Sequence, residues 1–129
     1  MPKAGNVTRP VRVLIADDHR LFAEALEVVL STEERIEVVG RAADGEEAVE
    51  LARSLRPDVV ALDISMPVMD GFEAAELLEQ FDDPPAVLML TGSSASEDVD
   101  RARRAGAKGY ITKDAIAASL VDAILAAAR

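Results

Sequence analysis

The chain of 129 residues contains no cysteine. Disulfide bonds, thiol chemistry and cysteine-ligated zinc sites are therefore excluded. Aromatic residues make up only 3% of the sequence, so a core must be built from Val, Leu, Ile, Ala and Met. Hydrophobic residues reach 50%, which is enough for a core in a chain of this length. The length is that of one ordinary domain.

Positive charge is scarce as well. Lys and Arg number 14 against 24 Asp and Glu, and the formal net charge is −10. A chain with this balance repels polyphosphates unless its basic residues cluster. No basic run is longer than Arg103-Arg104. We therefore expect this chain alone to bind no nucleic acid.

Long apolar runs are also missing. No run approaches the roughly 20 residues that cross a bilayer, and the first residues lack the apolar stretch of a signal peptide. Residues 1–10 are polar and are broken by Pro2, Gly5 and Pro10. We expect a flexible N-terminal segment over 1–10, one domain over 11–129, a cytoplasmic location and no membrane contact.

Short apolar runs alternate with helical patterns along the chain. Most of the runs are continuous and β-branched, which is typical of strands buried on both faces of a parallel sheet. Strands are expected at 11–16, 36–40, 59–62, 86–90 and 109–111. The fivefold alternation predicts an α/β fold, with a doubly wound parallel sheet covered by helices on both faces. The pattern alone does not give the strand order.

Apolar residues spaced three and four apart predict one buried face on each of four helices. These faces are Phe22, Ala25, Leu26 and Val29; Ala48, Leu51, Ala52 and Leu55; Ala74, Leu77, Leu78 and Phe81; and Ile116, Leu120, Ile124 and Ala127. A further helix, over about 96–105, offers only Val99, Ala102 and Ala105 to a core. We expect it to be the least firmly packed helix. Low local stability is common in elements that move, although a short exposed helix would look the same.

Helix ends carry their own signals. Three pairs with capping-box spacing predict helix N-termini: Asp44 with Glu47, Asp70 with Glu73, and Ser94 with Glu97. Gly106 is expected to end the helix before the fifth strand. Asp114 is expected to cap the last helix.

Polar residues follow four of the expected strands. In an open parallel sheet, ligands bind beyond the carboxyl ends of the strands. The residues at those ends are Asp17, Asp18, Asp63, Thr91 and Lys113. We therefore expect three acids, one hydroxyl and one amine to meet at one edge of the sheet.

This set of groups fits a single reaction. Neighbouring carboxylates raise each other's pKa, and Mg²⁺ would relieve the repulsion because it binds carboxylates together with water or phosphate. A carboxylate can attack phosphorus to give an aspartyl phosphate. The metal and an ammonium group would stabilise the transferred charge. His19, the only histidine, is expected at the surface beside these acids, with no catalytic role.

Each residue alone also has a plainer explanation. Asp17 or Asp18 could cap the first helix, and Asp63 could be a loop residue. Thr91 could belong to a turn, and Lys113 could be a solvated surface lysine. The joint placement of these residues at strand ends favours the site.

Four segments carry a resemblance: VLIADDHRLF, VVALDISMPVMDG, VLMLTG and AGAKGYITKD. They resemble, in the same order, the receiver domains of two-component response regulators. The likeness covers about residues 11–128, and the first and last segments are most similar to the NarL/FixJ type, which carries a C-terminal helix-turn-helix. The chain ends at Arg129 without that motif, as in a stand-alone receiver or one separated from its effector domain. The resemblance implies a flavodoxin-like five-stranded sheet in the order 2-1-3-4-5.

The resemblance also implies a magnesium site and a phosphoacceptor. Asp63 would accept a phosphoryl group from a histidine kinase or a phosphotransfer protein. Mg²⁺ would be bound by Asp17, Asp18, Asp63 and the backbone carbonyl of Ser65. Lys113 would pair with the phosphoryl oxygens.

Two further residues would take part in switching. The resemblance implies that Thr91 moves toward the phosphate and that Tyr110 turns inward behind it, although Tyr110 could equally be a surface tyrosine. Many receivers have a proline after the lysine, often with a cis bond, whereas Asp114 follows Lys113 here. A cis bond without proline costs about 2.5–4 kcal/mol. This cost favours a trans bond and leaves open how far Lys113 reaches.

Phosphorylation of Asp63 is expected to bias a two-state equilibrium. The new charge would pull on Thr91 and Lys113, and the helix at about 96–105 would shift. The face made by that helix, the fifth strand and the last helix would then change its affinity for an output partner or domain. Phosphorylation-dependent homodimerisation through that face is one form that the output could take.

Three alternatives stay open. A degenerate receiver would act only as a protein-interaction scaffold, although the complete set of acids argues against it. A haloacid-dehalogenase-type phosphatase would need a second acid two residues after its nucleophile, where Ser65 stands. A nucleotide-binding module is less favoured, because no glycine-rich phosphate loop follows the first strand. We expect no enzymatic activity beyond self-phosphorylation and self-dephosphorylation on Asp63.

Overall fold

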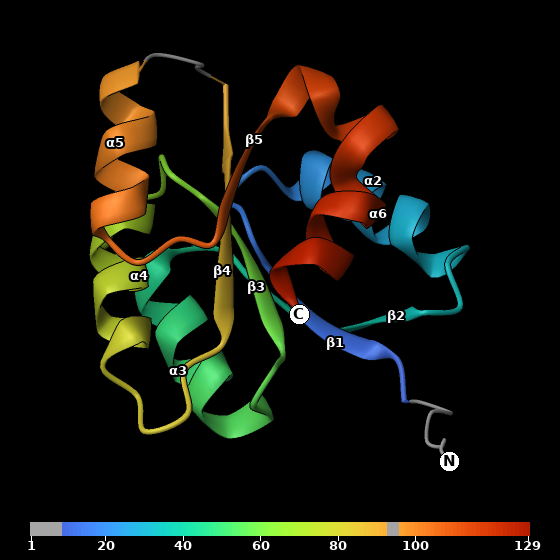
Figure 1. The fold of residues 1–129 in the computed structure, drawn as a ribbon, viewed down its shortest axis with the longest axis horizontal. Coiled ribbons are helices and arrows are strands. Elements are labelled where there is room, and N and C mark those ends of the chain that lie inside the picture. The colour runs from blue at the N-terminus through green and yellow to red at the C-terminus, as the bar shows by residue number, and fades with distance from the viewer. Residues whose placement is uncertain (1–8, 93–95) are drawn as a thin grey trace.

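The computed structural model describes residues 9–92 and 96–129, and these form one parallel sheet with helices on both faces (Figure 1). The sheet contains five strands in the order β2-β1-β3-β4-β5, so the predicted fold and strand order are confirmed. The strands are β1 (Val11–Ala16), β2 (Ile36–Ala42), β3 (Val59–Asp63), β4 (Ala86–Thr91) and β5 (Gly109–Thr112). The last four extend one or two residues beyond their apolar runs, because the polar residues that follow still pair along the ladder.

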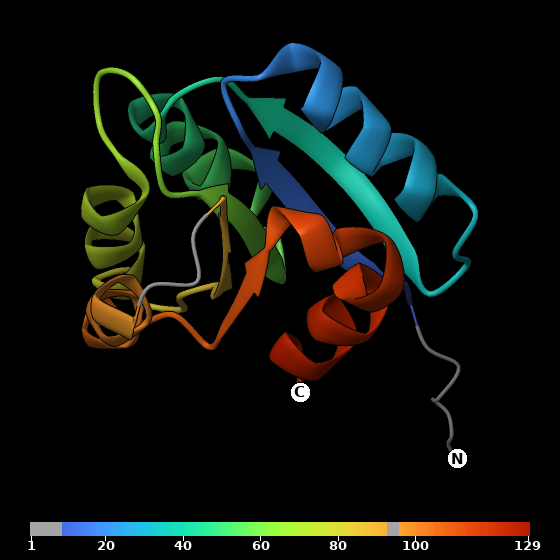
Figure 2. The ribbon, with the colours of Figure 1, turned by 90° about the horizontal axis from the view of Figure 1, so that it is seen from above.

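The helices cover the sheet in two layers (Figure 2). The helices are α2 (Arg20–Ser31), α3 (Gly45–Leu55), α4 (Gly71–Glu79), α5 (Ser96–Arg104) and α6 (Ile116–Ala127), with a short 3-10 helix η1 (Lys113–Ala115). One core cluster packs α3, α4 and α5 on one face, and a second packs α2 and α6 on the other. Every residue of β3 is buried, as expected for a central strand covered on both sides. Within the described ranges, no helix is long and apolar enough to cross a membrane.

Two of the predicted helix faces are confirmed. Ala48 and Ala52 are buried on α3, with Leu51 and Leu55 packed beside them. On α6 the whole predicted set is buried. The prediction for the 96–105 helix also holds in part: among the described residues of this stretch, only Ala102 in α5 and Ala105 just after it belong to the buried core.

The other two faces were partly wrong. On α2 the buried stripe is Ala23, Leu26 and Leu30, whereas Ala25 and Val29 are exposed. The apolar surface of this helix is wider than the stripe that the sheet covers, so the sequence allows more than one choice of buried residues. Packing against the sheet decides between these choices. On α4, Leu77 is exposed, and Phe72 supplies the buried bulk instead.

The helix ends follow most of the predicted signals. Asp44 accepts a hydrogen bond from the backbone N–H of Glu47 at 2.8 Å, and Asp70 accepts one from Glu73 at 2.9 Å. The proposed cap at Ser94 lies outside the described residues. Gly106 has a φ of 98° just beyond α5, as expected of a residue that ends a helix.

Asp114 does not cap the last helix. It lies inside η1, and the residue that precedes α6 is Ala115, which makes no side-chain cap hydrogen bond. The 3-10 turn leads directly into α6, so the aspartate falls one residue too early to act as the cap.

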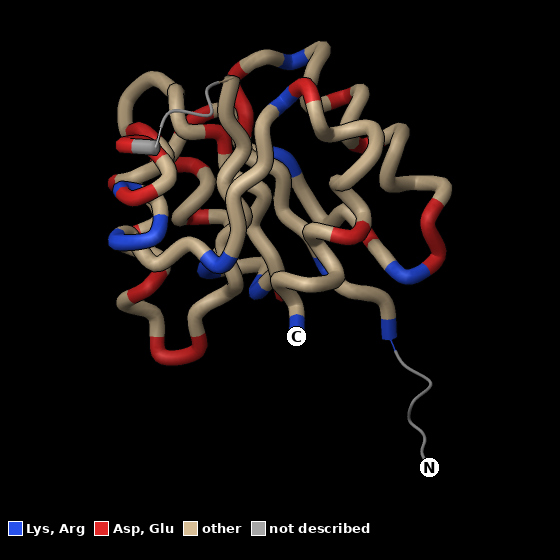
Figure 3. Tube along the Cα trace, turned by 45° about the horizontal axis from the view of Figure 1, so that its top comes forward, with Lys and Arg blue, Asp and Glu red and all other residues tan. Residues whose placement is uncertain are grey.

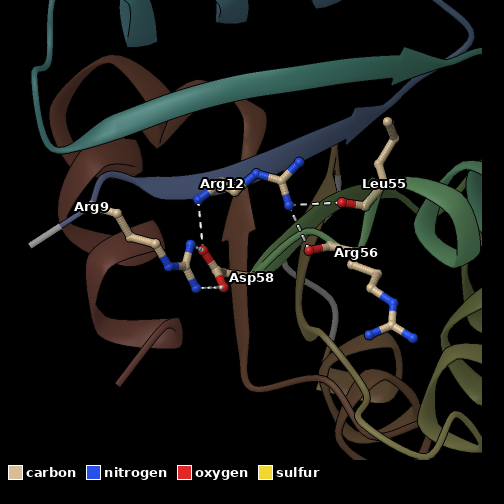
Figure 4. A network of polar contacts seen from close by, with 5 residues as sticks. All are labelled: Arg9, Arg12, Leu55, Arg56 and Asp58. Atoms are coloured by element: carbon tan, nitrogen blue, oxygen red, sulfur yellow. Dashed lines mark hydrogen bonds and ion pairs between the residues drawn. The ribbon is translucent and has the colours of Figure 1, made fainter.

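A polar network fixes the start of the sheet (Figure 4). Arg9 donates two hydrogen bonds to Asp58, at 2.9 and 3.0 Å, and the backbone N–H of Arg12 donates a third at 2.8 Å. The Arg12 guanidinium also donates to the carbonyls of Leu55 and Arg56, where α3 ends. Most of the expected N-terminal segment, residues 1–8, lies outside the described residues. Elsewhere Lys and Arg occupy short separate segments among the more numerous acids (Figure 3).

Candidate functional site

Polar side chains from four strands meet at the carboxyl edge of the sheet, which is at the top of Figure 1. Asp17 directly follows β1, Asp63 ends β3, Thr91 ends β4, and Lys113 directly follows β5. Asp17, Asp63 and Thr91 are the only buried polar or charged residues among those described, with exposed fractions of 3%, 3% and 5%. Burial of ionisable groups at one place needs compensation by charge or hydrogen bonding.

Lys113 supplies part of that compensation. Its Nζ lies 3.1 Å from Oδ2 of Asp17 and 3.6 Å from Oδ2 of Asp63. The described residues contain no cis peptide bond, so the bond between Lys113 and Asp114 is trans. The lysine therefore reaches both carboxylates without the cis proline that many receivers have at this point.

A contact that sequence reasoning missed lies beside this lysine. The Nζ of Lys113 is 4.4 Å from the centroid of the Phe22 ring, on the first turn of α2. Phe22 was predicted only as a core residue. No signal in the sequence links it to a lysine that is 91 positions away, because the contact depends on how α2 and β5 lie across the sheet edge.

The two acids after β1 do not cap α2. The residue that precedes this helix is His19, which makes no side-chain cap hydrogen bond. Instead, Oδ1 of Asp17 accepts the backbone N–H of His19 at 2.8 Å. This local hydrogen bond holds the Asp17 carboxylate toward the sheet edge. The Asp18 side chain is 34% exposed and lies beside it at the rim of the site.

One buried oxygen in the cluster lacks a hydrogen bond. Among the described residues, Oδ2 of Asp17 has no hydrogen-bond donor. The Lys113 ammonium at 3.1 Å pairs with it by charge. A buried carboxylate oxygen without a donor has room for a further positive partner.

The cluster fits a divalent cation. Asp17, Asp18, Asp63 and His19 each offer a ligand atom, and all four atoms lie within 4.8 Å of one another. The three carboxylates, including the Asp17 oxygen without a donor, form the hard, anionic set that Mg²⁺ prefers. His19 lies at the surface as predicted, with Nδ1 at 3.4 Å from Asp17 and 3.5 Å from Asp18.

The surroundings of Asp63 raise its pKa from 3.8 to about 6. Burial is the largest cause, and the Asp17 carboxylate adds to it; the Lys113 ammonium and the backbone N–H of Ser65 act in the opposite direction. The Asp63 carboxyl is thus ionised at neutral pH, although its surroundings disfavour the charged form. A cation or a bound electrophile would offset this effect. The role of the Ser65 carbonyl as a ligand stays a prediction.

The predicted switch residues lie close to this edge. Thr91 is buried at the end of β4, and none of the described residues outside its immediate neighbours would lie within 4 Å of a side chain at Gly92. Tyr110 is half-buried and packs against the core cluster of α3, α4 and α5. The roles of both residues in switching stay predictions.

The loop after β3 brings the backbone close to Asp63. Val68 has a φ of 70°, and the N–H of Met69 donates to the carbonyl of Pro67 at 2.7 Å, which closes a tight turn. A Cβ on Gly71 would collide with the carbonyl of Asp63, so only glycine fits there. Sequence reasoning did not identify Val68 as a strained position.

Comparisons with known proteins show the family of the chain. Residues 13–125 match the family of response regulator receiver domains, and the chain belongs to that family. It is 39% identical over 119 residues to the transcriptional regulatory protein LiaR of Bacillus subtilis, covering 92% of this chain and 56% of LiaR. The receiver domain of NarL from Mycobacterium tuberculosis superimposes with a TM-score of 0.90 at 37% identity, covering 94% of this chain and 98% of that one.

The same domain also occurs in a protein of a different kind. The chain is 44% identical over 112 residues to a protein-glutamate methylesterase/protein-glutamine glutaminase of Myxococcus xanthus, covering 84% of this chain and 31% of that protein. The chain spans about half the length of the transcriptional regulators it matches. The fold and the family are thereby shown, and they are shared among proteins with different outputs.

Proposed function

We propose that this receiver domain accepts a phosphoryl group on Asp63 and uses the added charge to control an output partner. One observation supports this above the others. The Lys113 ammonium lies within 3.6 Å of both Asp17 and Asp63, beside a buried carboxylate oxygen for which the described residues provide no hydrogen-bond donor. This arrangement provides a nucleophile, a positive charge and a place for a cation in one site.

The transfer itself needs little from the protein beyond positioning and charge. A carboxylate oxygen of Asp63 forms a bond to phosphorus while the bond from phosphorus to the donor breaks. The donor is a phosphohistidine of a histidine kinase or phosphotransfer protein, or a small acyl phosphate, and its nitrogen or oxygen leaves with the electron pair. Water later attacks the aspartyl phosphate and returns the Asp63 carboxylate and inorganic phosphate.

The protein's own groups have distinct parts in this reaction. The Lys113 ammonium pairs with the carboxylates before the transfer and with the phosphoryl oxygens after it. The buried Thr91 hydroxyl contacts the phosphorylated product. A magnesium ion held by Asp17, Asp18, Asp63 and the Ser65 carbonyl would neutralise phosphoryl charge. The phosphoryl acceptor in this reaction is the chain's own Asp63.

The helix α5 is the element best suited to report the change. Among the described residues, it contributes only the small residue Ala102 to the buried core, and Ala105 is buried just beyond its end. A shift of α5 would alter the surface around β5 and α6, where an output domain, another protein or a second copy of the chain could bind.

The test is intact mass after incubation with acetyl phosphate, with and without Mg²⁺. Wild-type protein should gain one phosphoryl group only when Mg²⁺ is present. Asp63→Asn should gain none, because its amide is a poor nucleophile, and Asp114→Asn serves as the matched control that still reacts. Addition of phosphate to Asp63→Asn at the wild-type rate would contradict the proposal.

A further inference from the structure

The ammonium of Lys113 has an aromatic neighbour as well as two acidic ones. Its Nζ lies 3.1 Å from Asp17, 3.6 Å from Asp63 and 4.4 Å from the centroid of the Phe22 ring. The lysine side chain is 23% exposed, so most of it is enclosed by the protein. A cation at this distance from a ring centroid is attracted by the ring's negative face.

Phe22 is held in place independently of the lysine. It lies in the first turn of α2, three positions after His19, and it is half-buried. Its ring packs against the core cluster formed by α2 and α6, while Lys113 follows β5. Packing therefore fixes the position of the Phe22 ring, whereas the lysine side chain is flexible.

We propose that Phe22 is a positioning residue for Lys113: its ring holds the ammonium against Asp17 and Asp63, ready to meet an incoming phosphoryl group. This inference rests on the proposed phosphorylation of Asp63 and adds a residue to that site. A lysine has a four-carbon stem with many rotamers. In this chain the residue after Lys113 is not proline, so the ring offers a restraint on the side chain that the backbone does not supply.

The attraction is specific to the aromatic face. Leucine would fill much of the same space, but it has no electron-rich face to hold a cation. Phe22→Leu should therefore keep the packing of α2 and loosen the lysine. Phe22→Tyr keeps the ring and should keep the restraint. If Phe22 were only a core residue, the two variants would differ in stability and not in how Lys113 behaves.

The first measurement requires no phosphorylation. The ε-methylene protons of Lys113, seen by carbon–proton NMR without Mg²⁺, should be shifted upfield by the ring. The shift should persist in Phe22→Tyr and disappear in Phe22→Leu. An unshifted signal in the wild type would overturn the proposal.

The second measurement is the rate of phosphorylation by acetyl phosphate at saturating Mg²⁺. Phe22→Leu should slow the reaction about fivefold, which is the scale of one cation–π contact, and Phe22→Tyr should react within about twofold of wild type. In a Lys113→Ala background, Phe22→Leu should have no further effect, since the residue it positions is gone. Leu125→Ala is the matched control, because it removes a half-buried side chain from the same core cluster away from the site.

The outcomes separate the two proposals. Equal slowing by Phe22→Leu with and without Lys113, or equal slowing by Leu125→Ala, would show that packing alone is responsible and overturn the positioning role. Normal rates in Phe22→Leu would overturn it as well. A wild-type protein that takes up no phosphoryl group would instead overturn the proposed function, and this inference with it.

Discussion

Asp17 and Lys113 face each other across the carboxyl edge of the sheet, with 3.1 Å between Oδ2 and Nζ. The aspartate is fully buried and its Oδ2 accepts no hydrogen bond from the described residues. The positive charge of Lys113 thus offsets part of the free-energy cost of burying the Asp17 carboxylate. The same pair places an ammonium where a transferred phosphoryl group would carry negative charge.

Removal of the ammonium should destabilise the folded protein. Lys113→Ala leaves the buried Asp17 and Asp63 carboxylates to repel each other. This repulsion should lower the free energy of unfolding by roughly 1–3 kcal/mol. The effect is smaller than for a fully buried ion pair, because the lysine is partly exposed. Urea unfolding at neutral pH without Mg²⁺ measures the change. Lys108→Ala, at an exposed lysine, is the control and should change little. Equal effects of the two substitutions would contradict the role of the pair.

Magnesium should stabilise the wild-type protein through the acidic cluster. A ligand at about 100 times its dissociation constant adds about 2.7 kcal/mol to the free energy of unfolding. Asp17→Asn should lose most of that gain, because it removes a carboxylate from the cluster of four ligand atoms. Thermal unfolding with Mg²⁺, and with NaCl at equal ionic strength, measures the difference. Asp82→Asn, at an exposed acid away from the cluster, should keep the full gain; an equal loss there would mean that magnesium acts only on the net charge.

The other end of the sheet should respond to acid. Burial raises the pKa of Asp58, but hydrogen bonds from the Arg9 side chain and the Arg12 backbone outweigh it, so the pKa lies below its ordinary 3.8. A lowered folded-state pKa means that this carboxylate stabilises the fold above its unfolded-state pKa. That stability is lost as the pH falls through the folded-state pKa.

Asp58→Ala should therefore cost about 1–2 kcal/mol at neutral pH, mainly because the backbone N–H of Arg12 loses its acceptor. The deficit should shrink below about pH 4, as the wild-type carboxylate is protonated. Urea unfolding at several pH values follows this change. Arg9→Ala removes only the exposed partner and should have a smaller effect. A deficit that is constant down to the acid transition would show that the charge of Asp58 does not contribute.

Val68 should be a place where substitution increases stability. It is a β-branched residue at a φ of 70°, a conformation that costs L-residues roughly 1–2 kcal/mol. Val68→Asn should raise the free energy of unfolding by about 1 kcal/mol, because asparagine tolerates this region better. Val28→Asn, at a valine that is 66% exposed in a helix, is the control and should bring no gain. A destabilised Val68→Asn would mean that the valine makes contacts that outweigh its strain.

Much of the fold followed from local patterns. Continuous β-branched runs such as residues 59–62 suit few structures other than buried parallel strands, so the five strands and their layers were predictable. Parallel strands carry their carboxyl ends to one edge, which is why the placement of Asp17, Asp63 and Lys113 could be anticipated. Their roles were suggested by the resemblance to receiver domains and stay predictions.

The wrong or missed predictions concern features that depend on contacts between segments in space. The face of α2 was misassigned because Val28 and Val29 make its surface apolar on several sides, and only contact with the sheet chooses among them. Asp114 was misassigned because an unforeseen 3-10 turn precedes α6. The contact between Phe22 and Lys113 depends on the relative position of two elements, which no spacing along the chain records.

The most direct test of the central claim is to locate the phosphoryl group. After reaction with acetyl phosphate and Mg²⁺, borohydride reduction converts an aspartyl phosphate to homoserine, and peptide mass spectrometry identifies the altered residue. The account predicts homoserine at position 63 alone, and none when Mg²⁺ is omitted. Modification at Asp17, Asp18 or a residue outside the cluster, with Asp63 unchanged, would contradict it.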